Sequence, residues 1–233
     1  ISPLGLAWIL AQVIAKDFSV TFLRKLIIND TLQRYGFSRG ALPITYLGLP
    51  LITSRLNNQI CTPLIQKICT KIDCWTTRIL RYSGRLQLLN TVLQGVQGYW
   101  SMYLFLPKSV LKRLQSIFAK FLWAGNLDAK CQYKVAWSDC CYTKDEGGLG
   151  IRDLFLCNSA AILYQVWRLS QPDPTSLWLI WVHSCFLKHK AFWTAKLPYK
   201  CPWSLRKIFN SRSLALQFIS YRVKMDSKFK AWH

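Results

Sequence analysis

Hydrophobic and polar positions follow the period of an α-helix along most of the chain. Segments with this spacing cover residues 57–80, 83–104, 109–123 and 153–169. Pro107 precedes the third segment and Gly125 follows it, as is usual at helix ends. In the fourth segment, five side chains are available for burial: Leu156, Ile162, Leu163, Val166 and Trp167. Residues 4–15 and 18–33 are earlier apolar stretches, the second interpreted as a helix. The sequence predicts a mainly α-helical fold.

Three short segments interrupt this helical pattern. Residues 42–51 hold two prolines and a glycine between β-prone residues, which predicts a tight β-hairpin or an extended turn. Residues 135–137 are interpreted as a short strand or extended segment, and 146–150 as a glycine-rich turn. We therefore expect a short N-terminal β-hairpin and a small extended segment near 134–151.

The segment 86–107 is uncharged and long enough to span a bilayer. Its polar residues recur at steps of three and four: Gln87, Asn90, Gln94, Gln97 and Ser101. Apolar residues recur in the complementary register: Leu89, Leu93, Val96, Trp100 and Tyr103. This pattern predicts one soluble helix with a water-facing stripe opposite a core-facing stripe, and not a membrane span.

Composition narrows the function. The 233 residues include 31 Lys and Arg against 10 Asp and Glu, a formal charge of +21. A hydrophobic fraction of 52% with 11 Trp excludes a disordered basic tail. The positive charge favours an anionic partner, nucleic acid before a membrane surface. Glu146 is the only glutamate, and the shortage of acids counts against catalysis by clustered carboxylates.

The cysteines and the first residues of the chain bear on the cellular compartment of the protein. The nine cysteines cannot all pair within one chain, and no CxxC motif occurs. Cys185 and His189 could be half of a metal site, but two unrelated helix residues explain them better. We expect reduced thiols in the cytoplasm or nucleus. The apolar stretch 4–15 lacks the basic residues that precede a secretion signal, and a start at Ile1 suggests a piece of a longer protein.

Basic residues at helical phase carry the best functional signal. Lys67, Lys71 and Arg78 fall within about 40° on one helix, and Lys112, Arg113 and Lys120 share a face on another. Two cationic faces without interleaved acids suit a phosphate backbone; the alternative is a solvated face. Arg85 lies in the first turn after Ser83, where either an anion or simple N-capping is possible.

Signatures of catalysis are missing from the sequence. The pair Gly148 and Gly150 lacks the third glycine of a dinucleotide loop, because residue 153 is Asp153. Neither a phosphate-binding P-loop nor the G-x-S-x-G elbow of hydrolases occurs. We expect that this chain does not catalyse a reaction by itself.

Several motifs, taken in order, carry a family resemblance. They are Gly36-Phe37 with 40–51 (GALPITYLGLPL), 83–88 (SGRLQL) with Val92-Leu93, and 121–125 (FLWAG). The segment 134–137 (KVAW) follows, then Cys141, Lys144, 147–151 (GGLGI), Asn158 and Trp167. In this order and spacing the sequence resembles the reverse transcriptase of plant LINE-type (non-LTR) retrotransposons, in the part C-terminal to the catalytic palm. The resemblance covers about residues 36 to 170.

The resemblance implies a role for each region. Residues 1–56 would be the end of the palm, with a hairpin around Tyr46, Leu47 and Gly48 that holds the primer end. Residues 57–171 would be the helical thumb and connection, which tracks the template–primer duplex. Residues 172–233 would be a basic helical segment leading to a zinc-binding domain beyond the end. The family's metal-binding aspartates lie upstream, so Mg²⁺ is expected only for the parent polymerase and no cofactor for this fragment.

Together these observations predict a thumb-like helical bundle that binds RNA, DNA or their hybrid without catalysis. The phosphate contacts are expected at Lys67, Lys71, Arg78, Arg85, Lys112, Arg113 and Lys120. One alternative is a helical scaffold whose charge only aids solubility, and another is the inactive product of a decayed element. A third is a peripheral membrane protein built on 177–187, with Trp178 and Trp181. Protein partners and oligomeric state are not predicted.

Overall fold

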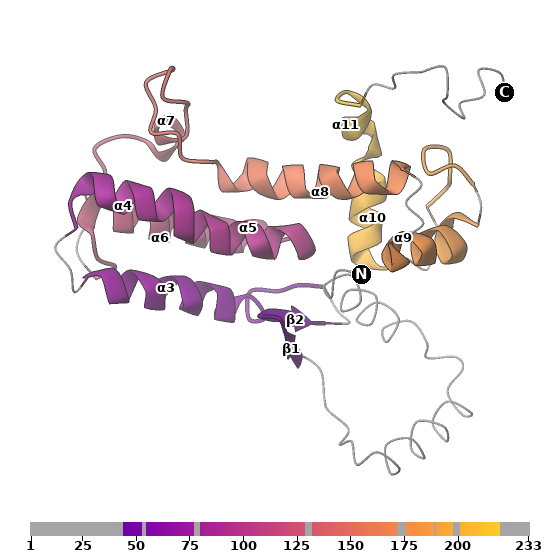
Figure 1. The fold of residues 1–233 in the computed structure, drawn as a ribbon, viewed down its shortest axis with the longest axis horizontal. Helices are drawn as coiled ribbons and strands as arrows, with labels where there is room; N and C mark the ends of the chain where they lie inside the picture. Colours follow the sequence, from indigo (N-terminus) through magenta and orange to yellow (C-terminus); the bar gives the residue numbers. More distant parts are fainter. Residues whose placement is uncertain are drawn as a thin grey trace, which may run out of the picture.

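The fold is known for most of the chain after the first forty residues (Figure 1). The computed structural model describes residues 44–52, 55–76, 80–128, 132–171, 176–188, 190–197 and 201–219. The apolar stretches at 4–15 and 18–33, Arg78, His189 and the segment 221–233 lie outside these residues.

The described residues are mainly helical, with a two-stranded antiparallel hairpin near the N-terminal end, as predicted. The strands are β1 (Ile44–Tyr46) and β2 (Leu49–Leu51). The longer helices are α3 (Thr62–Thr76), α5 (Gln94–Tyr103), α6 (Lys108–Ala124) and α8 (Leu154–Ser170). Shorter helices are α4 (Tyr82–Leu88), α7 (Trp137–Cys140), α9 (Leu177–Val182), α10 (Trp203–Asn210) and α11 (Arg212–Leu216). Two π-helical segments complete the order, η1 (Leu89–Leu93) and η2 (His183–Leu187).

The hairpin is closed by a two-residue turn. Tyr46 pairs with Leu49, and the residues between them, Leu47 and Gly48, have φ angles of 50° and 77°. Positive φ at both central positions is the type I′ geometry that matches the twist of paired strands. The Tyr99 hydroxyl of α5 donates a hydrogen bond of 2.8 Å to the carbonyl oxygen of Leu47. The hairpin tip is therefore attached to the helical bundle.

The predicted helix 83–104 is present, and Gln87 at the start of its polar stripe is exposed, but the stripe from Gln94 onward does not face water. α4, η1 and α5 follow one another as a single long helix (Figure 1), and Tyr82 rather than Ser83 begins it. Gln94, Gln97 and Ser101 are 4%, 1% and 2% exposed. The prediction was wrong for these three residues because α8 and the segment just before it pack on this part of the stripe and supply hydrogen-bond partners for Ser101 and Gln94. The Gln94 side chain bonds to Arg152, for example, through its backbone carbonyl at 2.9 Å.

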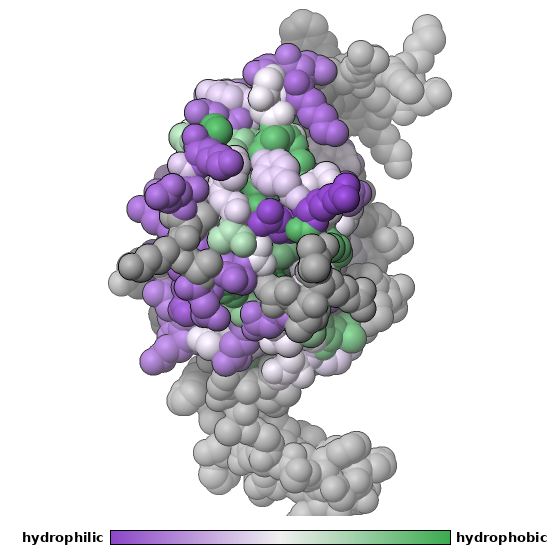
Figure 2. All heavy atoms as spheres, turned by 90° about the vertical axis from the view of Figure 1, so that its left-hand side faces the viewer, coloured by the Kyte–Doolittle hydropathy of each residue, from purple (hydrophilic) through white to green (hydrophobic). Residues whose placement is uncertain are grey.

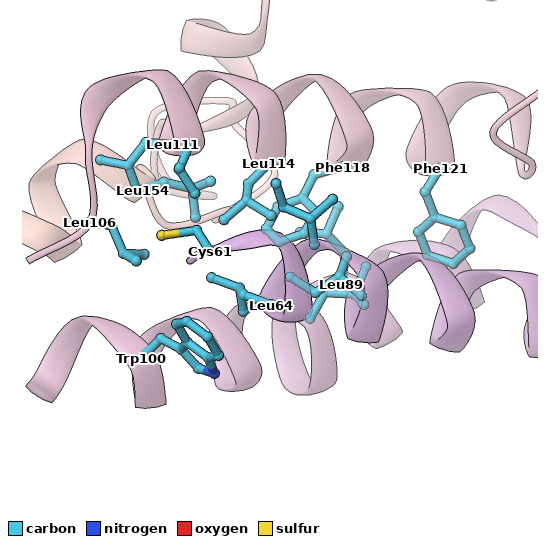
Figure 3. Packing of buried hydrophobic residues seen from close by; sticks show 14 of the residues in the cluster. Cys61, Leu64, Leu89, Trp100, Leu106, Leu111, Leu114, Phe118, Phe121 and Leu154 are labelled. Atoms are coloured by element: carbon cyan, nitrogen blue, oxygen red, sulfur yellow. The ribbon is translucent and has the colours of Figure 1, made fainter. Parts of the chain in front are cut away.

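A first hydrophobic core joins the hairpin to the helices from α3 to the start of α8 (Figure 3). α6 contributes a buried face that includes Leu111, Leu114 and Phe118, each at most 1% exposed. Opposite them lie Leu64 of α3 and Leu89 of the long helix, both fully buried. Pro107 and Gly125 flank α6 as predicted, and Gly125 closes it in the left-handed conformation with φ 82°. This core fixes which faces of α3 and α6 remain exposed.

A second hydrophobic core holds the C-terminal helices against the later turns of α8. It includes Ile162 and Val166 of α8, Val182 of α9 and Ile208 of α10. α8 therefore belongs to both cores: Leu154 lies in the first and Ile162 in the second. In Figure 1, α8 runs from the α7 end of the molecule to α10 and α11. The division into three regions expected from sequence, with boundaries at 56/57 and 171/172, stays a prediction.

The helix predicted at 153–169 begins as expected, but its exposed face differs. The Asp153 carboxylate caps α8 by accepting hydrogen bonds from the N–H groups of Phe155 (2.6 Å) and Leu156 (3.0 Å). Leu156 and Trp167, expected to be buried, are 71% and 43% exposed. The segment expected to be extended at 135–137 is irregular up to α7, which Trp137 begins.

Candidate nucleic-acid interface

α3 presents cations on the side away from the core. Lys67 is exposed and Lys71 is half-buried, whereas Ile65, Ile68 and Ile72 are between 0% and 5% exposed. Amphipathic packing explains this arrangement, because the isoleucines must be buried and the remaining arc of the helix stays in water. The contact of these lysines with phosphate stays a prediction.

α6 presents the second cationic face. Lys112 and Arg113 are exposed and Lys120 is half-buried, opposite the buried Val110 and Phe121. These charges span residues 112 to 120, about 12 Å at 1.5 Å per residue, and so occupy the middle part of the 17-residue helix. The arrangement of charged and apolar faces is the one expected from sequence.

The two helices meet near Cys69 of α3. Burial raises the pKa of the Cys69 thiol; the carboxylate of Asp73 raises it further, and the Arg113 guanidinium opposes both effects. The thiol thus feels the charge of Asp73 from its own helix and that of Arg113 from α6. Sequence spacing, which compares residues within one helix, does not reveal that the charge of Arg113 on α6 acts on a residue of α3.

Arg85 is placed differently from the other predicted contacts. Its side chain lies against the end of α6, and its Nε is buried without a hydrogen-bond partner. A Cβ added at Gly125 would lie 2.9 Å from Nη1 of Arg85. The last carbonyls of a helix carry partial negative charge, which favours a cation at this position. The geometry supports a role for Arg85 in joining α4 to α6.

Replacing Gly125 by alanine is expected to lower the free energy of unfolding by about 1–2 kcal/mol. The new Cβ would meet the Arg85 guanidinium, and an L-residue at φ 82° is strained in any case. Urea unfolding followed by tryptophan fluorescence measures the loss. Gly95→Ala is the matched control, because a Cβ there meets nothing within 4 Å and φ is not positive. Equal stability of the two variants would contradict this placement of Arg85.

A groove lined by aromatic residues runs beside the cationic face of α6. Its volume is about 440 Å³, and its walls come from α6, the segment before α7, α7 itself and the start of α8. The aromatic lining residues are Trp123, Tyr133, Trp137 and Phe155. Lys112 also lines the groove, so a cation and aromatic surfaces face the same space. Tyr133 is 53% exposed. It belongs to no periodic pattern of the sequence, so its place in the groove was not predicted.

The exposed surface near this region mixes both kinds of side chain. Figure 2 shows the end of the molecule where α3 ends and α4 begins. Hydrophilic residues cover much of this face, and hydrophobic residues are visible between them. At the opposite end of α3, the hairpin tip exposes two apolar side chains, Tyr46 at 39% and Leu47 at 52% (Figure 1). Leu47 holds a positive φ, which is uncommon for a residue other than glycine and which the type I′ turn of the hairpin requires.

Other chemistry is not evident in the part of the chain that the structure describes. Within it, no three His, Cys, Asp or Glu side chains come together as a metal site would require. A search of the same residues finds no helix with the length and hydrophobicity needed to cross a membrane. Glu146 has a structural partner: it accepts hydrogen bonds from the N–H (3.1 Å) and the hydroxyl (2.9 Å) of Thr143.

The chain is similar to plant proteins. A protein of Arabidopsis thaliana named "Putative ribonuclease H protein" is 33% identical over 132 residues, which make up 57% of this chain and 21% of that protein. An uncharacterized mitochondrial protein of the same plant is 29% identical over 128 residues, 54% of this chain and 82% of that protein. No protein-family model matches the chain.

The chain spans about a fifth of the length of the first of these relatives. These similarities confirm one part of the resemblance described above, namely that the chain is related to plant proteins. The finer assignment, to the reverse transcriptase of LINE-type elements, stays a prediction.

Proposed function

We propose that this chain binds the sugar-phosphate backbone of RNA, DNA or an RNA–DNA hybrid. The observation that carries the proposal is the pair of cationic helix faces, with Lys67 exposed on α3 and Lys112 and Arg113 exposed on α6. Each phosphate that such residues neutralise releases condensed counterions, which drives binding at low salt. The net charge of +21 adds long-range attraction for a polyanion.

The aromatic groove supports contact with bases as well. Single-stranded nucleic acids bind where aromatic side chains offer stacking surfaces beside a cationic track. Trp123, Tyr133 and Trp137 line such a space, and Lys112 lines it with them. A strand whose phosphates follow α6 would then place unpaired bases against these rings.

We further propose that the chain is the palm-end, thumb and connection part of a retrotransposon RNA-directed DNA polymerase and acts there without catalysing a reaction itself. Support comes from the ordered motifs between residues 36 and 170 and from the ribonuclease name of the first relative. The hairpin agrees with a primer-holding role, because its tip exposes Tyr46 and Leu47. Metal ions and catalytic aspartates would belong to the rest of such a polymerase.

The membrane alternative has little support in the structure. Of the two tryptophans on which that alternative was built, Trp181 is half-buried against the second core, and Trp178 is 5% exposed and belongs to that core. Its ring lies 5.6 Å from the Arg168 guanidinium carbon, inside the protein. A side chain held in this way cannot insert into a bilayer surface while the fold is intact.

Reversing two charges on α6 tests the proposal. The double variant Lys112→Glu and Arg113→Glu is expected to reduce the slope of log K against log salt by about 2, since about one counterion is released per phosphate contact. Binding of a short RNA–DNA hybrid duplex, measured by fluorescence anisotropy over a salt series, gives this slope. The control pair Lys190→Glu and Lys196→Glu changes the net charge equally at exposed sites in the C-terminal half.

Two results would count against the proposal. Equal slopes for the test and control pairs would leave only a general charge effect and remove α6 from the interface. A chain with its native sequence that ignores single strands and hybrid duplexes at low salt would exclude nucleic-acid binding altogether.

A further inference from the structure

Two cations from distant parts of the chain meet over one aromatic ring. The Arg55 guanidinium carbon lies 5.0 Å from the centroid of the Trp203 ring, and Nζ of Lys207 lies 5.5 Å from it. Arg55 follows the hairpin, whereas Trp203 and Lys207 belong to α10. The Phe105 ring packs on Trp203 at 6.3 Å and helps to fix its orientation.

A third cation, Lys108, is near enough for its charge to act on Lys207. Burial lowers the pKa of Lys207, and the charges of Arg55 and Lys108 lower it further. Lys108 is exposed and is the first residue of α6, and Pro107 before it provides no side-chain cap. The positive end of a long helix dipole is therefore directed to the same region.

The cluster is electrostatically unfavourable when empty. Three like charges repel one another, and among the described residues no carboxylate is a cause of the Lys207 shift. Cation–π contacts with Trp203 offset part of this cost but do not neutralise the charge. An anion placed among the three side chains would replace repulsion by attraction, and guanidinium and ammonium groups are well suited to phosphate oxygens.

We propose that Arg55, Lys108 and Lys207 form a phosphate-binding site around Trp203, and that its ligand is a phosphate group of a nucleic-acid strand. The choice of strand rests on the proposed function. Lys108 and Lys112 are four residues apart, so they share one side of α6, and Lys112 lines the aromatic groove. A strand that follows α6 toward its N-terminus would reach this site, which extends the interface to α10.

The test removes two of the three charges of this site and uses the full-length chain. For Arg55→Gln with Lys207→Gln, we expect the salt slope for a short RNA–DNA hybrid to fall by about 2. The pair Lys190→Gln and Lys196→Gln, exposed and elsewhere, should leave the slope unchanged. Because Arg55 also packs on Trp203, the exposed single variant Lys108→Gln is included; it should reduce the slope by about 1 with no loss of stability.

A second measurement separates the sources of phosphate. The titration of the Lys207 amino group is followed by NMR with and without inorganic phosphate, and bound phosphate should raise its pKa. If the hybrid does not bind but phosphate shifts this titration, the site is supported with free phosphate as its source, and the proposed function fails. If the hybrid binds with unchanged slopes in both the double and the Lys108→Gln variants, the site is rejected while the proposed function stands. If neither ligand has an effect, both are rejected.

Discussion

Replacing Arg212 by methionine is expected to lower the free energy of unfolding by about 3 kcal/mol. The guanidinium of Arg212, at the start of α11, joins several segments of the second core. Nη1 donates to the carbonyl oxygens of Phe192 (2.7 Å), Trp193 (3.2 Å) and Ala195 (2.8 Å), and Nε donates to that of Phe209 (3.1 Å). Methionine fills a similar volume but leaves these carbonyls without their donor.

The same side chain lies between two aromatic rings. Its guanidinium carbon is 4.7 Å from the Phe209 centroid and 5.5 Å from the Phe192 centroid. Burial lowers the pKa of Arg212, which would nevertheless remain charged at neutral pH. Loss of the charge therefore removes cation–π attraction together with the hydrogen bonds.

Urea unfolding monitored by tryptophan fluorescence measures this loss. Arg81→Met is the matched control, because Arg81 is exposed, and it should change stability by less than about 0.5 kcal/mol. Arg212→Lys should lose nearly as much stability as Arg212→Met, because one ammonium group cannot supply the fixed fork of donors. Wild-type stability in either Arg212 variant would show that the connection is not needed.

The helices with clear end signals were predictable from sequence. The expected segment 109–123 became α6, which extends only one residue further at each end. Pro107 and Gly125 act locally, through fixed and left-handed backbone conformations, so no knowledge of neighbours was needed. The turn at 146–150 was predicted for the same reason. In this turn a glycine is required at position 148, because a Cβ added to Gly148 would collide with the backbone carbonyl of Tyr142.

Burial depended on partners that spacing along one helix does not identify. The stripe of Gln94, Gln97 and Ser101 was correctly separated from the apolar stripe, but its assignment to water was wrong. Polar groups can be buried where a neighbour completes their hydrogen bonds, and Asn158 of α8 and Arg152 just before it do so here. Leu156 shows the converse, because nothing among the described residues covers the face of α8 on which it lies.

The candidate interface likewise contains residues whose position could be predicted from sequence and residues whose position could not. Exposure of Lys67, Lys112 and Arg113 followed from the phase of each helix relative to its own apolar residues. The position of Arg85 against the end of α6 did not, since it depends on how α4 and α6 pack. The cluster of Arg55 with Lys207 could not be predicted from sequence either. Only tertiary contacts bring together residues so far apart in the chain.

Replacing Asn158 by alanine is expected to lower the free energy of unfolding by about 2–3 kcal/mol. Asn158 is 6% exposed and lies on α8 where the two cores meet. Its Oδ1 accepts hydrogen bonds from the Leu106 N–H (3.2 Å) and the Ser101 hydroxyl (3.5 Å), and its Nδ2 donates to the Leu106 carbonyl (3.5 Å). Gln97 extends the network by donating to the Ser101 oxygen at 2.6 Å.

Most of this loss should come from the Leu106 backbone. Once Asn158 is truncated, the N–H of Leu106 stays buried between α5 and α6 without an acceptor. Such an unsatisfied donor costs about 1–3 kcal/mol. Ser159→Ala is the matched control, because the neighbouring Ser159 is exposed and bonds only within its own helix. Asn158→Asp keeps both acceptor contacts but buries a charge, so it should also destabilise, and more strongly above the carboxyl pKa than below it. If all three variants unfold at the same urea concentration, the polar stripe of α5 is not what joins α8 to the bundle.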